Sequence, residues 1–305
     1  MLIGGLISAV YSTLNSSQKL DFGIVSDYSK YLMNNGVGGA FVNGSTGDFV
    51  SLSVEERKTN IKHWSKYRSN KFRIINHVGH TSVDVAKELA KDSIDKVDAI
   101  SALAPYYFKI TSVEKLVNYC KEVASSAPDL PFYYYHIPVL SGANILMNEF
   151  VAVASKEIEN FAGIKFTQEN LEDFRKTKNH KARLNVLFGV DELFLKSLDC
   201  GAKGWVGSTY NHIAPLYFEI KRLYEKGEVD LAEDLQKKAV LFVETLNSFG
   251  RYNGVAKGFM GVLGIDCGPS RFPHNNPDKK TFDVILEKLK IFGLEKYFGK
   301  NAYLR

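Results

Sequence analysis

The sequence predicts an α/β protein, a closed (β/α)8 or TIM barrel with a C-terminal helical extension. Strand-like and helix-like segments alternate eight times over roughly the first 225 residues. Such alternation indicates a parallel sheet, and eight units are typical of a closed barrel. A doubly wound open sheet usually has a G-x-G-x-x-G segment after its first strand, and Leu2–Leu6 lacks that spacing. We therefore expect residues 1–225 to form the barrel and residues 226–305 to pack on it as helices.

Local signals define the first four strand–helix units. Leu2–Tyr11 is apolar with no basic flank before it, so it is interpreted as a strand rather than a signal sequence. Asn35-Gly36 ends the first helix, and Ser53-Val-Glu-Glu56 has the capping-box pattern that starts the second. The predicted elements are strand Leu2–Tyr11, helix Phe22–Asn35, strand Ala40–Asn43, helix Ser53–Arg68, strand Phe72–Val78, helix Ser82–Lys96, strand Ala99–Ala104 and helix Ser112–Ala127.

The remaining units follow the same pattern. Pro138 closes the fifth strand, because proline cannot donate a hydrogen bond to a sheet. Beyond about Leu216 the sequence indicates helices with no strand pattern, apart from the turn-rich Gly268–Pro277. The predicted elements are strand Phe132–His136, helix Asn148–Ile158, strand Phe161–Thr167, helix Leu171–Asn179, strand Leu184–Val190, helix Glu192–Asp199 and strand Ala202–Ser208.

The strand Phe161–Thr167 carries a lysine in an apolar setting. Lysine is rarely buried without a partner, burial disfavours the charged form of an amine, and a neutral amine attacks carbonyl carbons. An edge-strand lysine that reaches solvent is the alternative, and the rest of the chain must decide between the two. Alternation predicts one face with Ala162, Ile164 and Phe166 toward the helices, and the other with Phe161, Gly163, Lys165 and Thr167.

Composition argues against nucleic-acid, membrane and extracellular classes of protein. Hydrophobic residues make up 45% of the chain and charged residues 24%, as in ordinary soluble domains. The net charge of +5 comes from basic residues interspersed with acidic ones, so we expect no nucleic-acid partner. No apolar run is long enough to span a membrane. The 3 cysteines are far apart without C-x-x-C spacing, which predicts a reducing, cytoplasmic location.

The carboxyl ends of the predicted strands carry hydroxyls, acids and one amine, and barrel enzymes place their chemistry at this rim. Alternation puts Phe41, Asn43 and Ser45 on one face. On a strand, His77 and His80 would face opposite ways, and no acid–histidine cluster is near them, so we expect no metal site. The lack of a G-x-S-x-G elbow argues against a serine hydrolase. The rim suits a polyhydroxylated substrate with a carbonyl group.

Five short motifs occur in an order and spacing that is specific when they are taken together. They are Gly44-Ser-Thr-Gly47, Tyr133-Tyr-Tyr-His-Ile-Pro138, Gly163-Ile-Lys165, Gly189-Val-Asp-Glu192 and Gly207-Ser-Thr-Tyr-Asn211. With these motifs the chain, from Leu2 to about Pro273, resembles the N-acetylneuraminate lyase and dihydrodipicolinate synthase family of pyruvate-handling Schiff-base aldolases. The similarity to the lyase branch is greatest in Phe132–Ser141 and Phe188–Asn211.

The resemblance implies a role for each matching residue. Lys165 would form a Schiff base with the 2-keto carbon of the substrate, and Tyr135 would transfer protons near that amine and the C4 hydroxyl. Ser45 and Thr46 would hold the substrate carboxylate in a glycine-flanked turn. Tyr107 matches an aromatic residue that in relatives reaches toward a neighbouring subunit's site, which implies a homotetramer. The residues that match positions binding the sugar tail are Thr167, Gly189, Asp191, Glu192 and Ser208.

Leu140 bears on which branch of the family the chain resembles. The synthases typically have an arginine at this position, and a leucine cannot bind a second carboxylate. The resemblance thus implies reversible retro-aldol cleavage of sialic acid (N-acetylneuraminate) to N-acetylmannosamine and pyruvate, without a cofactor. A sister aldolase for another 2-keto-3-deoxy sugar acid and a non-catalytic keto-acid sensor or scaffold stay open. Asp48 and His136 replace a commoner glutamate and asparagine, which leaves fine specificity open.

Other conspicuous side chains are interpreted as structural. Tyr210 and Tyr252 are interpreted as packing residues, with a place at the edge of the pocket as the alternative, and Trp205 is expected to pack outward against helices. The histidines without a motif are expected at the surface or in helix caps; these are His63, His180, His212 and His274.

Overall fold

The computed structural model describes residues 3–182 and 184–300. Eight parallel strands pair in sequence order, and the first also pairs with the last, which confirms the predicted closed barrel. The strands are β1 (Gly5–Ala9), β2 (Gly39–Val42), β3 (Arg73–His77), β4 (Ala99–Leu103), β5 (Phe132–His136), β6 (Phe161–Phe166), β7 (Asn185–Phe188) and β8 (Gly204–Gly207).

Helices connect the strands where the sequence predicts them, with ends that differ by a few residues. The one-turn helix α5 after Pro138 was not predicted. The α-helices are α1 (Val25–Asn34), α2 (Val54–Trp64), α3 (Val83–Asp92), α4 (Val113–Ala124), α5 (Pro138–Ser141), α6 (Met147–Glu157), α7 (Leu171–Lys178), α8 (Phe194–Asp199), α9 (Tyr210–Glu225), α10 (Val229–Ser248), α11 (Tyr252–Val262) and α12 (Lys279–Ile291). Single 3₁₀ turns are η1 (Phe49–Ser51), η2 (Ser65–Tyr67), η3 (Asp191–Leu193) and η4 (Glu295–Tyr297).

Side-chain caps fix the starts of several helices. The Ser53 hydroxyl accepts a hydrogen bond from the Glu56 backbone N–H, and the Glu56 carboxylate accepts one from the Ser53 N–H, which confirms the predicted capping box. Ser112 caps α4 in the same way through its hydroxyl, and Asn170 caps α7 through its side-chain oxygen. Each cap satisfies a backbone donor that would otherwise be unpaired, so these residues determine where the helices begin.

The structure has two apolar cores, an inner one inside the barrel and an outer one between the sheet and the helices. Phe41, Tyr133 and Tyr135 belong to the inner core. Trp205 belongs to the outer core and packs against Phe194 of α8 with ring centroids 4.8 Å apart, as predicted. A filled inner core leaves space for a ligand only where the barrel opens at its rim.

The predicted side-chain directions are wrong at two places. A register irregularity between β5 and β6 pairs Phe132 with Phe161 but Tyr133 with Gly163. Phe161 consequently packs in the outer core and Ala162 against the inner one, the reverse of simple alternation. Asn43 does not share a face with Phe41, because its backbone is left-handed (φ 57°) and its side chain pairs with those of Asn60 and Asn76.

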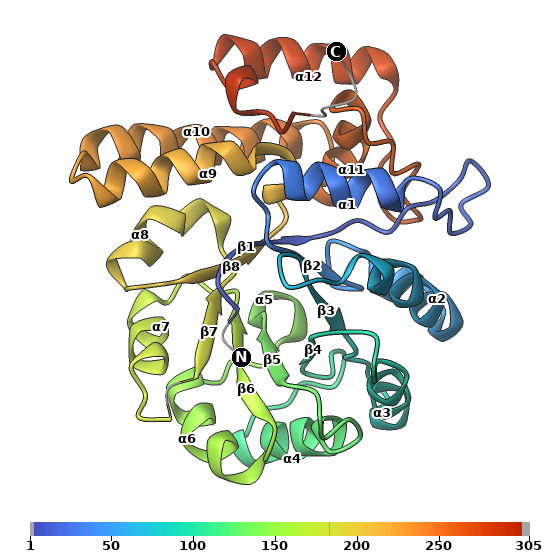
Figure 1. Cartoon of the computed structure of the whole chain (residues 1–305), viewed down its shortest axis with the longest axis vertical. Helices are drawn as coiled ribbons and strands as arrows, with labels where there is room; N and C mark the ends of the chain where they lie inside the picture. Colours follow the sequence, from blue (N-terminus) through green and yellow to red (C-terminus); the bar gives the residue numbers. More distant parts are fainter. Residues whose placement is uncertain (1–2, 183, 301–305) are drawn as a thin grey trace.

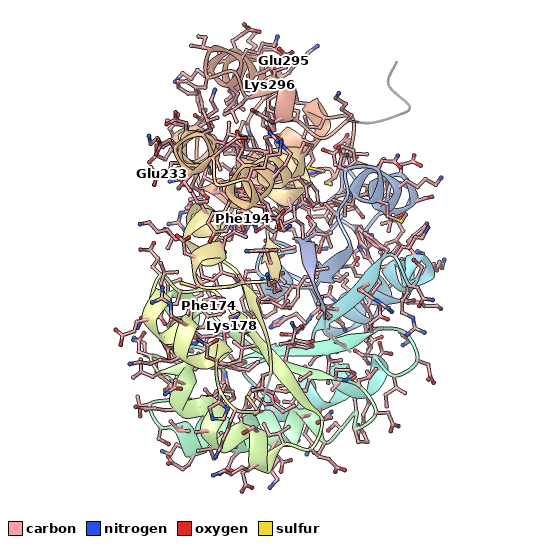
Figure 2. The ribbon with its side chains drawn as sticks, turned by 60° about the vertical axis from the view of Figure 1, so that its left-hand side comes forward. Phe174, Lys178, Phe194, Glu233, Glu295 and Lys296 are labelled. Carbon is pink, nitrogen blue, oxygen red and sulfur yellow. The ribbon has the colours of Figure 1, made fainter. Side chains whose placement is uncertain are left out.

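The chain after the barrel forms a layer on one side of it. In Figure 1, α10, α11 and α12, coloured orange to red, lie beyond α9 and α1 at the top of the view. Figure 2 shows the same order along the long axis, from Phe174 on α7 through Phe194 on α8 to Glu233 on α10 and Glu295 in η4. Within the described ranges, no helix is both long enough and apolar enough to cross a membrane.

Candidate active site

A cavity of about 380 Å³ opens at the carboxyl ends of the strands. Strands β5 to β8 and the turn after β2 supply most of its wall, and all the predicted site residues except Tyr107 line it. Those residues are Ser45, Thr46, Tyr135, Lys165, Thr167, Gly189, Asp191, Glu192 and Ser208. The structure therefore brings together side chains that are up to 163 positions apart in the sequence, from Ser45 to Ser208.

Lys165 lies in the wall of this cavity with only 4% of its surface exposed. Its Nζ atom is 4.0 Å from the ring centroid of Tyr135, the residue paired with it across β5 and β6, and 4.2 Å from that of Phe41. Gly163 allows β6 to pair closely with β7, because a Cβ atom there would lie 1.8 Å from the Asn185 carbonyl oxygen of β7. The amine is thus sheltered and faces two aromatic rings.

Tyr135 and the turn after β2 form the wall beside the amine. The hydroxyl groups of Tyr135 and Ser45 are 3.4 Å apart. Backbone hydrogen bonds from Asp48 N–H to Ser45 O (3.0 Å) and from Phe49 N–H to Gly44 O (3.4 Å) fold the turn, and Asp48 adopts a left-handed backbone there (φ 53°). Hydroxyls and backbone N–H groups in such a turn suit an anionic ligand group.

Asp191 provides a buried acid at the opposite wall. Its Oδ2 atom accepts hydrogen bonds from the Thr209 backbone N–H (3.0 Å) and hydroxyl (2.6 Å), and its Oδ1 atom has no hydrogen-bond partner among the described residues. Burial raises the pKa of Asp191, while the bonds from Thr209 oppose that shift. A Cβ atom on Gly207 would lie 1.7 Å from Oδ1, so only glycine leaves room for this carboxylate.

The remaining predicted residues continue the same polar wall. The buried Thr167 hydroxyl has no hydrogen-bond partner within the described chain, and a Cβ atom on Gly189 would lie 2.2 Å from its oxygen. Burial, and secondarily the Asp191 charge, raise the pKa of Glu192. The Ser208 hydroxyl lies 3.5 Å from that of Tyr252. Unpaired buried oxygens at Thr167 and Asp191 are suited to a ligand that brings its own hydroxyl donors.

The sequence did not identify every residue that lines the cavity. Val243 and Asn247 of α10 complete its wall without having been singled out, and Tyr252 of α11, interpreted as packing, also lines it. His212 was expected at the surface or in a helix cap but is fully buried, with its Nε2–H donating to the Ala256 carbonyl (2.8 Å). No motif marks these positions, since they come from helices whose docking on the barrel is not encoded in any local pattern.

Tyr107 lies outside the cavity on the loop after β4. Its side chain is 85% exposed, and its backbone is left-handed (φ 79°). Burial lowers the pKa of His77 well below its usual range, and within the described chain its ring nitrogens bond backbone groups of Asn43 and Leu103. Across residues 3–182 and 184–300, no group of three or more histidine, cysteine, aspartate or glutamate side chains is arranged to hold a metal ion.

Similarity to known proteins agrees with this geometry. Residues 2–290 match the Dihydrodipicolinate synthetase family. The chain belongs to this family. It is 38% identical to N-acetylneuraminate lyase A of Xenopus laevis, over 88% of this chain and 90% of that one. It is 35% identical to the N-acetylneuraminate lyase of Homo sapiens, over 94% and 91% of the two chains.

Solved structures of the family extend the similarity to three dimensions. The N-acetylneuraminate lyase (sialic acid aldolase) of Aliivibrio salmonicida superposes with a TM-score of 0.92 at 34% identity, over 98% of this chain and 99% of that one. The fold of the Dihydrodipicolinate synthetase family is thus present along nearly the whole chain, and the family resemblance inferred from the five motifs is confirmed.

Proposed function

We propose that the chain is an N-acetylneuraminate lyase that cleaves N-acetylneuraminate reversibly to N-acetylmannosamine and pyruvate. The observation that carries this proposal is the buried Lys165 amine beside Tyr135 and the Ser45 turn, in a cavity whose other wall is polar and acidic. The relatives that bear this name cover nearly the same length of sequence, which supports the same assignment.

Lys165 is proposed as the nucleophile. Its Nζ atom adds to C2 of the open-chain substrate, and loss of water gives a protonated imine. The C3–C4 bond then breaks, its electron pair moves into the imine system as an enamine, and C4 becomes the aldehyde of N-acetylmannosamine. Protonation of the enamine at C3 and hydrolysis of the imine release pyruvate and restore the amine. The rings of Tyr135 and Phe41, 4.0 and 4.2 Å from Nζ, can stabilise the cationic imine.

Tyr135 is proposed as the proton-transfer group: it relays the C4 hydroxyl proton as the bond breaks, and the same relay can deliver a proton to C3 of the enamine. Ser45 and Thr46 would bind the carboxylate next to C2, since their turn adjoins both the amine and the tyrosine. Thr167, Gly189, Asp191, Glu192 and Ser208 would hold the hydroxylated tail along the polar wall. The reaction uses side-chain chemistry alone, so no cofactor is proposed.

Borohydride trapping tests the nucleophile. Pyruvate with borohydride should attach covalently to the wild type but not to Lys165→Arg, because arginine cannot form the imine. Labelling that persists in the variant would remove Lys165 from this role.

Cleavage kinetics, combined with the trapping assay for pyruvate affinity, separate the role of Tyr135 from that of a binding residue. Tyr135→Phe should lower kcat by about 10²- to 10⁴-fold with little change in pyruvate affinity, as expected for a group that moves a proton in the transition state. Equal losses in both quantities would contradict the role. The matched control is Tyr133→Phe on the same strand, whose hydroxyl bonds Asn185 at the other end of the barrel.

A sister aldolase for another 2-keto-3-deoxy sugar acid is the alternative. It differs only in the polar wall, since any such substrate needs Lys165 and Tyr135. Pyruvate release from a panel of sugar acids, read through lactate dehydrogenase, distinguishes the two, with sialic acid expected to be the best substrate. A keto-acid sensor without catalysis would release no pyruvate from any of them.

The same proposal includes a homotetramer, a cytoplasmic location and a boundary at residue 225 between the barrel and its C-terminal helical extension. Tyr107, Phe108 and Val139 are 84–85% exposed, and the Lys109 side chain lies against Gly142, so their two loops adjoin. Apolar side chains so exposed support a contact with a second copy. A monomer in sedimentation analysis would contradict it. The buried thiols of Cys120, Cys200 and Cys267, which form no disulfides, support a reducing location.

A further inference from the structure

The segment after α11, residues Asp266–Asn276, folds back over the turn that follows β2, and we refer to it as the C-terminal strap. Arg271 makes its main contacts. One terminal nitrogen donates to the Ser51 carbonyl (2.7 Å) and the Glu56 carboxylate (2.9 Å), and the other to Glu56 (2.5 Å) and the Gln18 carbonyl (2.8 Å). The guanidinium thus joins the N-terminal loop, the turn and the first residues of α2.

A short chain of hydrogen bonds leads from Arg271 to the cavity. The Ser51 hydroxyl donates to the Asp48 carboxylate (2.5 Å), and the Asp48 backbone N–H donates to the Ser45 carbonyl (3.0 Å). Asp48 also lies 3.5 Å from Nε2 of His274, which belongs to the strap. Ser45 is the residue whose hydroxyl approaches Tyr135, so the strap and the reacting groups are connected through one turn.

The strap is itself firmly anchored. The Leu14 N–H donates to the Cys267 carbonyl (2.9 Å), and the buried Lys257 amine donates to the Pro269 carbonyl (2.7 Å). Gly268 has a left-handed backbone (φ 70°), and a Cβ atom there would lie 1.7 Å from the Leu14 carbonyl oxygen. These contacts fix the backbone of the strap just before Arg271, so the Arg271 side chain can hold the turn in place.

We propose that Arg271 is a positioning residue that holds the Ser45–Thr46 turn in the geometry needed to bind the substrate carboxylate. The inference rests on the proposed function, in which that turn binds the carboxylate. Arg271 itself does not line the cavity. Its bidentate bridge to Glu56 together with two carbonyls requires a planar guanidinium, and a lysine provides only a point charge. Loss of the bridge therefore alters the carboxylate site without altering the amine.

The test compares two ketones in borohydride trapping at Lys165: pyruvate, which has a carboxylate, and hydroxyacetone, which has none. In Arg271→Lys, the concentration of pyruvate that gives half-maximal labelling should rise by about tenfold, within the range expected when a distant change misplaces a binding group. The rate of labelling by hydroxyacetone should stay as in the wild type, because this ketone does not use the turn.

Two further variants make the outcome decisive. Glu56→Gln keeps an acceptor for the Ser53 N–H but removes the charge opposite Arg271, and it should show the same selective effect. Lys237→Ala removes an exposed ion pair with Asp234 on α10 and should change neither ketone. If both ketones weaken equally in folded Arg271→Lys, or neither changes, the positioning role is wrong. If wild type is not labelled by pyruvate at all, the proposed function itself fails.

Discussion

Replacing Gly207 with alanine should disable the polar wall of the cavity while sparing the amine. A Cβ atom at this position would lie 1.7 Å from Oδ1 of Asp191 and 2.4 Å from its Cγ atom. Ordinary carbon–oxygen contacts are about 3.3 Å or more, so the carboxylate has to move by more than an ångström. It then loses both hydrogen bonds from Thr209, each worth about 1.5 kcal/mol or more for a charged acceptor.

The stability lost in Gly207→Ala is therefore about 3–6 kcal/mol, below most of the 5–15 kcal/mol range typical of folded domains, so we expect the variant to remain folded, which its circular dichroism spectrum checks. Misplacing a substrate-binding group by an ångström costs about 10²-fold in rate, so we expect kcat/KM for N-acetylneuraminate to fall by about that factor. Lys165 lies on β6, away from Gly207 on β8, and its labelling by pyruvate and borohydride should persist.

A matched control for this experiment is Gly261→Ala on α11, where an added Cβ atom meets nothing within 4 Å. It should leave activity unchanged and stabilise the helix by up to about 1 kcal/mol. Normal cleavage of N-acetylneuraminate by Gly207→Ala, or loss of pyruvate labelling in parallel with cleavage in a folded variant, would refute the reasoning.

Two predictions concern the pH dependence of stability, measured by denaturant unfolding. Burial lowers the pKa of His212 to about 4, so the contribution of His212 to the free energy of unfolding is complete above the unfolded pKa of about 6.5 and is lost as the pH falls toward 4. This loss of about 3 kcal/mol should be absent in His212→Gln. A variant with the same pH profile as the wild type would contradict the prediction. Burial raises the pKa of Glu192, so the wild type loses stability as the pH rises through the folded pKa of this carboxyl group. Glu192→Gln should therefore be more stable than the wild type at pH 8 but not at pH 4. A stability difference between the two proteins that does not change with pH would exclude this cause.

The sequence was sufficient to predict the strands, most helices and most of the cavity wall, because the sequence patterns that indicate them are local. Apolar segments of strand length recur between amphipathic helices, and the Ser53–Glu56 capping box specifies a helix start by itself. Once the barrel was predicted, the carboxyl ends of the strands had to meet at one rim. That rule put Lys165 and Tyr135 on the same rim, and the family resemblance implied that they adjoin; the Lys165 amine lies 4.0 Å from the Tyr135 ring centroid.

The wrong predictions concern features that depend on a partner distant in sequence. The irregular pairing at Phe161 depends on Phe132 of β5, and simple alternation has no means of detecting it. Asn43 turns away from the inner face because Asn60 and Asn76 offer it hydrogen bonds. His212 and Tyr252 acquire their surroundings only when α10 and α11 dock, and no repeat in the sequence encodes that docking.

The two ends of the cavity are built from different parts of the chain, and this bears on how substrate choice is controlled. The reactive end consists of β5, β6 and the turn after β2, whose residues are held by barrel pairing and by the strap. The other end combines Asp191 and Ser208 of the rim with Asn247 and Tyr252 of the helices beyond the barrel. Under the proposed function the Schiff base needs only the first end, so we expect changes at Asn247 or Tyr252 to alter which sugar acid is accepted while Lys165 still captures pyruvate. The helices beyond the barrel are therefore the part of the fold in which substrate specificity can change without loss of the imine chemistry.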